Sequence, residues 1–325
     1  MGFGTIGFRG EDVVLAFSAR ERRVPVRDAV PRLEDWARRY DAASRTDDHA
    51  ALSSIGREMF DWLDDDGWGS AWAGAPDDRV LEIRVEGRGP REEVALLDAP
   101  WELLAREDGP LALDPVQLFV VARRIGPEGK TFEPEHGDLR LMFMAAAPDG
   151  QAFLDFEEEE AAILEATQDS RRVHLVVEET GALDPLGDRL ASEEGPFQAL
   201  HLSCHGDIHA DRGPVLLLER PEGGAAAADA GELVGAFGAP ERRPPLVVLS
   251  ACRTAEVGAP GGSAGSGRRA ARRDAGPRTG RSPELTASFA RQLAAVSANV
   301  VGWDGSVYDS VATGFAAAFY TELGR

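Results

Sequence analysis

The chain has 325 residues, of which 43% are hydrophobic and 28% are charged, and it contains two cysteines. At about 150 residues per domain, this length predicts two compact units with ordinary buried cores, and the composition excludes a largely disordered or fibrous chain. Asp and Glu outnumber Lys and Arg, and the formal net charge is −21. Because phosphate affinity depends on neutralisation by cationic side chains, we expect no direct binding of nucleic acid or of an anionic membrane by this region.

No apolar run in the sequence reaches the roughly 18 to 20 residues that span a bilayer, and the first residues lack a basic stretch followed by an apolar one. We therefore expect a cytoplasmic protein. Two cysteines cannot form a disulfide framework, and a reducing compartment would keep both of them as thiols.

The first part of the chain predicts a helix-rich unit with strands around it. Apolar side chains recur every three or four residues over 26–43 and 48–63, which is typical of amphipathic helices. Short β-rich runs indicate strands at 11–19, 79–85 and 117–122. Between the last two strands, an acidic residue followed by Pro100 indicates the start of a helix.

Residues 126–138 are rich in Gly, Pro, Glu and His, which is typical of a linker. Beyond them, strands alternate with helices. The predicted strands are 139–147, 173–177, 197–203, 215–218, 246–251 and 299–302. The predicted helices are 153–167, 182–191, 228–237, 284–295 and 306–323. This alternation predicts an α/β fold with a mostly parallel sheet covered by helices on both faces, with function at the carboxyl ends of the strands.

One segment, residues 257–282, departs from this pattern. It is rich in Gly, Ala, Ser and Arg, has almost nothing to bury, and contains six arginines: Arg268, Arg269, Arg272, Arg273, Arg278 and Arg281. A loop of this length without structure of its own is usually disordered or functional, and we expect it to be flexible.

Both cysteines follow strand patterns, Cys204 in HLSCHG and Cys252 in LSACRT. If these strands are parallel neighbours, His205 and Cys252 emerge at the same edge of the sheet. A thiolate is the nucleophilic form of cysteine, and an adjacent imidazole can take its proton and later protonate a leaving amine. The backbone N–H groups of Gly206 and Cys252 are candidates for an oxyanion hole. The pattern predicts a Cys–His dyad for acyl transfer, with no cofactor.

Three other interpretations remain open at this point. Cysteine is among the most buried residue types, so either thiol can simply belong to the core. A disulfide between the two cysteines is a further alternative. A zinc site is the third, although the alternation of side chains along a strand sends His201 and Cys204 to opposite faces of the sheet. The candidate zinc ligands are His201, Cys204, His205, His209 and Cys252.

Several short motifs of the sequence resemble those of a known protein family. HLSCHG at 201–206, followed by LVVLSAC at 246–252, resembles the paired His-Gly and Ser-Ala-Cys strands of CHAT-domain proteases, caspase-like peptidases related to separase and gingipain. PWELL at 100–104 is similar to a signature in the N-terminal, catalytically silent lobe of that family. NVVGWDGSVYD at 299–309 and the helix after it are similar to the last core strand and helix of the family.

The resemblance implies a caspase-like, mostly parallel sheet flanked by helices, with a silent pseudo-caspase lobe at 1–130 and a catalytic lobe at 139–325. It implies that His205 is the general base and acid, that Cys252 is the nucleophile and that Gly206 contributes to the oxyanion hole. It assigns no role to Cys204, which we expect in the core. A protein or peptide is the implied substrate, and a sensor domain or partner protein in bacterial antiviral defence is the implied activator.

The alternative from another functional class is a non-catalytic CHAT-like scaffold that docks partners, and a zinc-binding module is the third.

For substrate selection, we expect Asp304 and Asp309 to line a pocket that selects Arg, although one of them can instead cap the final helix. The basic segment 257–282 can occupy the site in cis or be cleaved by it. Relatives commonly continue beyond the position of Arg325, so we expect a fragment of a larger protein. The acidic run at 157–160 predicts a solvated first turn stabilised by the helix dipole.

Overall fold

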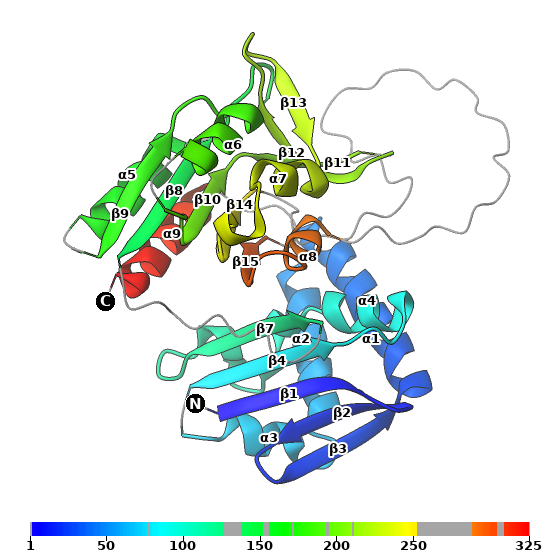
Figure 1. Ribbon diagram of the computed structural model, residues 1–325. Helices are drawn as coiled ribbons and strands as arrows, with labels where there is room; N and C mark the ends of the chain where they lie inside the picture. The colour runs from blue at the N-terminus through cyan, green and yellow to red at the C-terminus, as the bar shows by residue number, and fades with distance from the viewer. Residues whose placement is uncertain are drawn as a thin grey trace, which may run out of the picture. The chain divides into compact units, whose positions relative to one another are not determined.

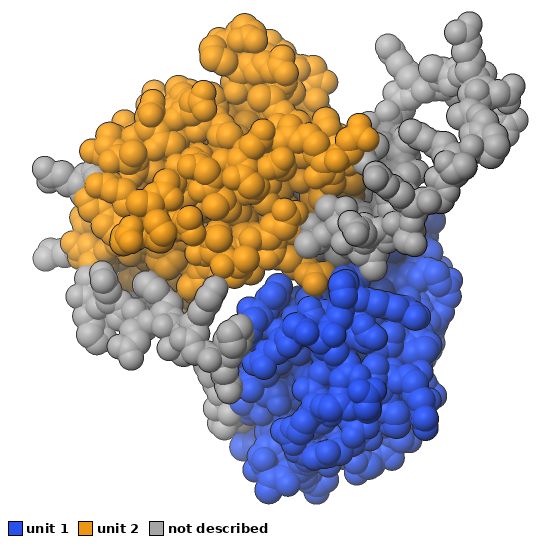
Figure 2. All heavy atoms as spheres, turned by 45° about the vertical axis from the view of Figure 1, so that its right-hand side comes forward, with its two compact units in different colours: residues 1–128 blue, residues 129–325 orange. Residues whose placement is uncertain are grey.

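The structure is a computed structural model that describes residues 2–76, 78–126, 138–151, 156–168, 170, 172–192, 195–209, 211–251, 288–303 and 309–324. The chain divides into two compact units, residues 1–128 and 129–325 (Figure 1, Figure 2). Nearly all of the predicted linker lies outside the described residues. Among the helices that the structure describes, none combines the length and the apolar character needed to cross a membrane.

Unit 1 contains a five-stranded sheet in the order β3-β2-β1-β4-β7 (Figure 1). Its strands are β1 (Gly2–Arg9), β2 (Asp12–Phe17), β3 (Arg20–Pro25), β4 (Arg79–Val85) and β7 (Phe119–Ile125). The first three form antiparallel hairpins, whereas β1, β4 and β7 run parallel. The helices are α1 (Val26–Ser44), α2 (His49–Leu63), α3 (Trp68–Ala73) and α4 (Pro90–Asp98), and a small hairpin consists of β5 (Ala105–Arg106) and β6 (Gly109–Pro110). The sequence did not predict β1 or β3, because neither has a strong β-forming pattern of its own.

The core of unit 1 is built around tryptophans that include Trp36, Trp62 and Trp101. The predicted helix start at Pro100 is wrong: α4 ends just before it, and Trp101–Leu103 form a single 3-10 turn. The reason is the burial of Trp101, whose indole Nε1 donates a hydrogen bond of 2.8 Å to the carbonyl oxygen of Leu96 in α4. That bond folds the chain back onto the helix it has just left. Two further 3-10 turns lie at Leu111–Leu113 and Pro240–Arg242.

Unit 2 contains a five-stranded sheet, parallel throughout, in the order β15-β14-β10-β8-β9. Its strands are β8 (Leu139–Ala145), β9 (Val173–Glu178), β10 (Ala199–Ser203), β14 (Leu246–Ser250) and β15 (Asn299–Gly302). All five residues of the central strand β10 are buried, as expected for a strand covered on both faces. The prediction of an α/β fold with a mostly parallel sheet is confirmed.

Helices cover both faces of this sheet (Figure 1). They are α5 (Phe156–Thr167) and α9 (Asp309–Leu323) on one face, and α6 (Leu183–Ser192), α7 (Ala230–Ala236) and α8 (Phe289–Leu293) on the other. The two faces alternate along β10. Ala199 lies in the core beneath α5 and α9, whereas Leu200 and Leu202 lie in the core on the opposite face.

A three-stranded antiparallel sheet follows β10. It consists of β11 (His205–His209), β12 (Gly213–Glu219) and β13 (Ala225–Ala228). Only β12 was predicted. β11 is polar and β13 is four alanines, so neither shows a strand pattern. They become strands because β12, almost entirely buried, offers each of them a partner for its backbone hydrogen bonds.

Candidate active site

The two strands that end before the predicted dyad are direct neighbours. β10 and β14 run parallel, and their register pairs Leu202 with Leu249 and Ser203 with Ser250. The backbone N–H of Cys204 donates a hydrogen bond of 3.2 Å to the carbonyl oxygen of Ser250, which continues the pairing beyond the end of β10. The two strands therefore end level with each other at the carboxyl edge of the sheet.

His205 and Cys252 follow the two paired serines at the same distance along the chain. His205 is two residues after Ser203, and Cys252 is two residues after Ser250. His205 is half-buried and opens β11, where Gly206 follows it. Pairing with β12 holds this segment, because His205 is opposite Leu217 and Gly206 is opposite Leu216. The placement of His205 is thus fixed by β10 on one side and by β12 on the other.

Several predicted residues lie outside the described part of the chain. These are Cys252, Asp304 and the whole segment 257–282. Asp309 is the first residue of α9, and its side chain is not described. The roles predicted for these residues stay predictions. The described part of the site comprises the chain up to Ala251, together with His205 and Gly206.

Cys204 lies in the core of unit 2, as the sequence predicted. Only 2% of it is exposed, and it belongs to the same cluster as Leu202, Leu249 and Ala251. This cluster packs under α6, α7 and α8. It lies on one face of the sheet, and His201 and Ser203 lie on the opposite face. Strand alternation therefore separates Cys204 from His201, as required of a strand buried on both sides.

His201 is fully buried and already has neighbours on both ring nitrogens. Its Nδ1 lies 3.0 Å from the hydroxyl oxygen of Tyr320 in α9. Its Nε2 lies 3.2 Å from Glu159 Oε1, without the geometry of a hydrogen bond. Among the residues that the structure describes, no group of three or more His, Cys, Asp or Glu side chains converges as metal ligands do. His201 and Cys204 therefore do not come together as the zinc interpretation requires.

The residue that sequence reasoning missed is Glu159. The acidic run at 157–160 was predicted to be a solvated turn, and Glu157 and Glu158 are exposed, but only 4% of Glu159 is exposed. Glu159 shares the buried face of α5 with Ile163 and Thr167, at intervals of four residues. That spacing is the signal that could have identified it.

The Glu159 carboxylate accepts hydrogen bonds from two serines. The hydroxyl of Ser203 donates to Oε2 at 2.5 Å, and the hydroxyl of Ser250 donates to Oε1 at 2.6 Å. Burial acts to raise the pKa of this carboxyl, but the contacts with His201, Ser203 and Ser250 outweigh burial and hold the pKa below its ordinary value. Glu159 is therefore a carboxylate at neutral pH, bound to both strands at the point where they end.

Tyr320 closes the polar cluster on the side of α9. It is fully buried, and burial, with a smaller contribution from the Glu159 charge, raises the pKa of its phenol well above the ordinary value. The side chain therefore keeps its O–H and stays a neutral hydrogen-bonding partner of His201. Its ring also lies beside the imidazole, with the two ring centroids 5.7 Å apart.

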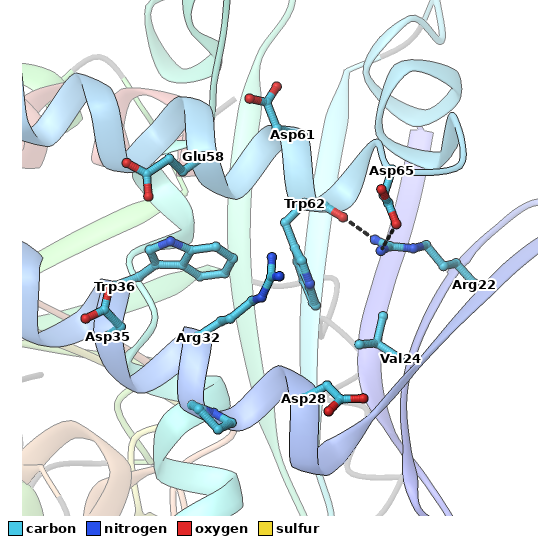
Figure 3. A pocket seen from close by; sticks show the side chains of 11 residues that line it. Arg22, Val24, Asp28, Arg32, Asp35, Trp36, Glu58, Asp61, Trp62 and Asp65 are labelled. Carbon is cyan, nitrogen blue, oxygen red and sulfur yellow. Dashed lines mark hydrogen bonds and ion pairs between the residues drawn. The ribbon is translucent and has the colours of Figure 1, made fainter.

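A hollow with a volume of about 800 Å³ is lined entirely by residues of unit 1 (Figure 3). Trp36 and Trp62 pack edge to face there, 5.6 Å apart, and carboxylates surround them. Most of these carboxylates are already neutralised: Asp65 lies 3.1 Å from Arg22, and Arg39 binds both Glu58 and Asp35. Such exposed pairs contribute little to stability, and they leave little unmatched charge for a ligand.

A comparison of the sequence with models of protein families gives one match. The CHAT domain model matches residues 91–325. This match begins within α4 of unit 1, includes the PWELL element and extends over all of unit 2. No curated protein matches the chain. The family match covers more than half of the chain, and the parallel sheet flanked by helices agrees with the caspase-like fold of this family. The chain therefore belongs to the CHAT-domain family, which is related to the caspase-like cysteine proteases.

Proposed function

We propose that this protein is a cysteine endopeptidase in which Cys252 is the nucleophile and His205 is the general base and acid. The observation that supports this most directly is the register of β10 and β14. It pairs Ser203 with Ser250, two residues before His205 and two residues before Cys252. A cysteine at the end of a buried strand is usually a core residue, but a core cysteine needs no histidine at the same offset on the neighbouring strand.

The chemistry follows from these groups. His205 takes the proton of the Cys252 thiol, and the thiolate attacks the carbonyl carbon of the scissile peptide bond. The backbone N–H groups of Gly206 and Cys252 donate to the oxyanion of the tetrahedral intermediate. When the intermediate collapses, the C–N bond breaks and His205 protonates the leaving amine. Water, deprotonated by His205, then hydrolyses the thioester and releases the free thiol.

The substrate and the setting are also part of the proposal. The net charge of −21 favours a basic protein or peptide substrate, and Asp304 and Asp309 would select Arg before the scissile bond. The family resemblance supports a cytoplasmic role in bacterial antiviral defence. There, a sensor domain or partner protein would activate the peptidase.

Labelling with a peptide probe tests the proposal. We expect a biotinylated acyloxymethyl ketone peptide with Arg at its reactive end to add mass to Cys252, as located by mass spectrometry of the digested protein. Cys252→Ala and His205→Ala should both abolish this labelling. His209→Ala is the matched control, because His209 lies on β11 with His205 and is exposed. Cys204→Ala is the matched control for the nucleophile, because it removes only a buried thiol.

The same experiment separates the peptidase from the non-catalytic scaffold. A scaffold would show no preference of the probe for Cys252 over other nucleophiles, and His205→Ala would leave its labelling unchanged. Either result in folded protein would contradict the proposed mechanism.

A further inference from the structure

We infer that Glu159 is a positioning residue for the proposed Cys252–His205 pair: its buried carboxylate ties the ends of β10 and β14 together, two residues before each member of the pair. This inference rests on the proposed peptidase function. Glu159 itself would touch neither the substrate nor the reacting atoms, and it acts through the two strands that it joins.

The contacts divide the carboxylate between the two strands. Oε2 accepts from Ser203 on β10 at 2.5 Å, and Oε1 accepts from Ser250 on β14 at 2.6 Å. An ionised carboxylate can only accept hydrogen bonds, so the hydroxyl hydrogens of both serines must point at Glu159. Each serine is thereby held in one orientation by the same group, which comes from a third element, α5.

The carboxylate is itself oriented from behind. His201 Nε2 faces Oε1 at 3.2 Å, and Tyr320 holds the other ring nitrogen of His201 at 3.0 Å. Four elements, α5, β10, β14 and α9, therefore meet in a single polar cluster.

The place of this cluster on the sheet separates it from ordinary core packing. On the same face, Val248 lies one step before Ser250 on β14, and Ala199 lies two steps before Ser203 on β10, beyond His201; both Val248 and Ala199 are buried and apolar. Burying a carboxylate is less favourable than burying an apolar side chain of similar size, so packing alone does not call for one. The polar groups lie at the end of the strands that leads to His205 and Cys252.

A strand rises about 3.3 Å per residue, so two residues carry the chain only about 6 to 7 Å beyond the serines. Little chain remains to absorb a change in the spacing of β10 and β14 before it reaches the dyad. A misplacement of about 1 Å can reduce the rate of a positioned reaction by about 100-fold. Fixing the two serines to one carboxylate limits this movement.

The test is the rate at which iodoacetamide alkylates Cys252, measured by mass spectrometry of the digested protein between about pH 5 and pH 9. This readout reports the thiolate and needs no knowledge of the natural substrate. In the wild type, we expect a rate that depends on His205. In Glu159→Gln, we expect the rate at pH 7 to fall by about 10-fold or more and the pH midpoint to move towards about 8.5, the value of a free cysteine. Glu157→Gln is the matched control, because Glu157 lies in the same helical turn and is exposed.

Smaller changes keep the test valid if Glu159→Gln does not fold, as judged by circular dichroism. Ser203→Ala and Ser250→Ala each remove one of the two hydrogen bonds, and we expect each to slow alkylation by a smaller factor. In the Glu159→Gln background, Ser250→Ala should slow alkylation by a smaller factor than it does in the wild type, because the charged acceptor of the Ser250 hydroxyl is already lost. Independent effects that multiply would contradict the inference.

The outcomes distinguish this inference from the function on which it rests. If alkylation of Cys252 depends on His205 but is unchanged in folded Glu159→Gln and in both serine variants, Glu159 is not a positioning residue and the proposed function stands. An equal loss in Glu157→Gln would also contradict the inference. If alkylation of the wild type does not depend on His205, the proposed function fails and this inference fails with it.

Discussion

Ser250 Oγ lies 2.6 Å from Glu159 Oε1, although the two residues are 91 positions apart in the chain. The contact joins the first turn of α5 to the last residue of β14. Ser203 meets the other oxygen of the same carboxylate. The spacing of the two central strands at their carboxyl ends thus depends on a residue from a helix outside the sheet.

Glu159 predicts a specific dependence of stability on pH. Its pKa in the folded protein lies below the ordinary value, so its stabilisation is fully present above the unfolded pKa and is lost as the pH falls through the folded pKa. We expect Glu159→Gln to lower the free energy of unfolding by about 1 to 3 kcal/mol at pH 7. The difference from the wild type should shrink towards pH 3. Thermal melts at a series of pH values check this, and parallel curves for the two proteins would contradict it.

Tyr320→Phe tests the contact behind His201. The change keeps the buried ring but removes the hydroxyl that lies 3.0 Å from Nδ1. We expect the variant to be less stable by about 1 kcal/mol, measured by chemical denaturation, because one buried hydrogen bond is lost. The double variant with Glu159→Gln serves as the control. Strict additivity of the two changes would show that Tyr320 and Glu159 do not act through a shared histidine.

Gly56 marks a close approach between α2 and the PWELL element. A Cβ at this position would lie 1.9 Å from the carbonyl oxygen of Leu103, and that backbone atom cannot rotate away. We therefore expect Gly56→Ala to destabilise unit 1 by about 3 kcal/mol or more. Ser53→Ala, at an exposed position of the same helix, is the matched control. Denaturation followed by tryptophan fluorescence is the measurement, because five of the six tryptophans lie in unit 1. Equal stability of the two variants would contradict the prediction.

The basic segment 257–282 provides a test within the chain itself. It contains six arginines and begins five residues after the proposed nucleophile, and the proposed pocket selects Arg. We expect the incubated wild type to be cut between Val257 and Ser282, and Cys252→Ala to stay intact. Mass spectrometry of the incubated proteins gives the cleavage site. Uncut wild-type protein that still reacts with the peptide probe would argue against self-cleavage.

Asp304 and Asp309 give separate predictions for specificity. If one of them binds the substrate arginine, its change to Asn should raise KM for an Arg peptide by about 10-fold or more, which corresponds to at least about 1.4 kcal/mol. A matched peptide with Gln in place of Arg should be affected much less. If neither Asp304→Asn nor Asp309→Asn changes the ratio of the KM values for the two peptides, the pocket that binds the substrate arginine is formed by other residues.

Much of the architecture could be predicted from local patterns. The apolar runs at 139–147 and 246–251 became buried parallel strands, and the helical periodicity at 26–43 and 48–63 became α1 and α2. The strands that were missed, such as β11 and β13, lack a pattern of their own. They form because β12 supplies backbone partners from elsewhere in the chain. The end of α4 before Pro100 was also misjudged, because the position of Trp101 depends on packing.

By itself, the sequence determined that strand ends would carry a histidine, a glycine and a cysteine, because apolar runs stop directly before them. It also fixed which residues alternate between the two faces of each strand, since side chains on a strand alternate by geometry. Only the tertiary structure decided that β10 and β14 are neighbours in a register that pairs Ser203 with Ser250. It alone decided that one glutamate of an acidic run is buried between them. The physical reason is that a carboxylate can be buried only where donors from distant segments converge on it, and no local pattern records that convergence.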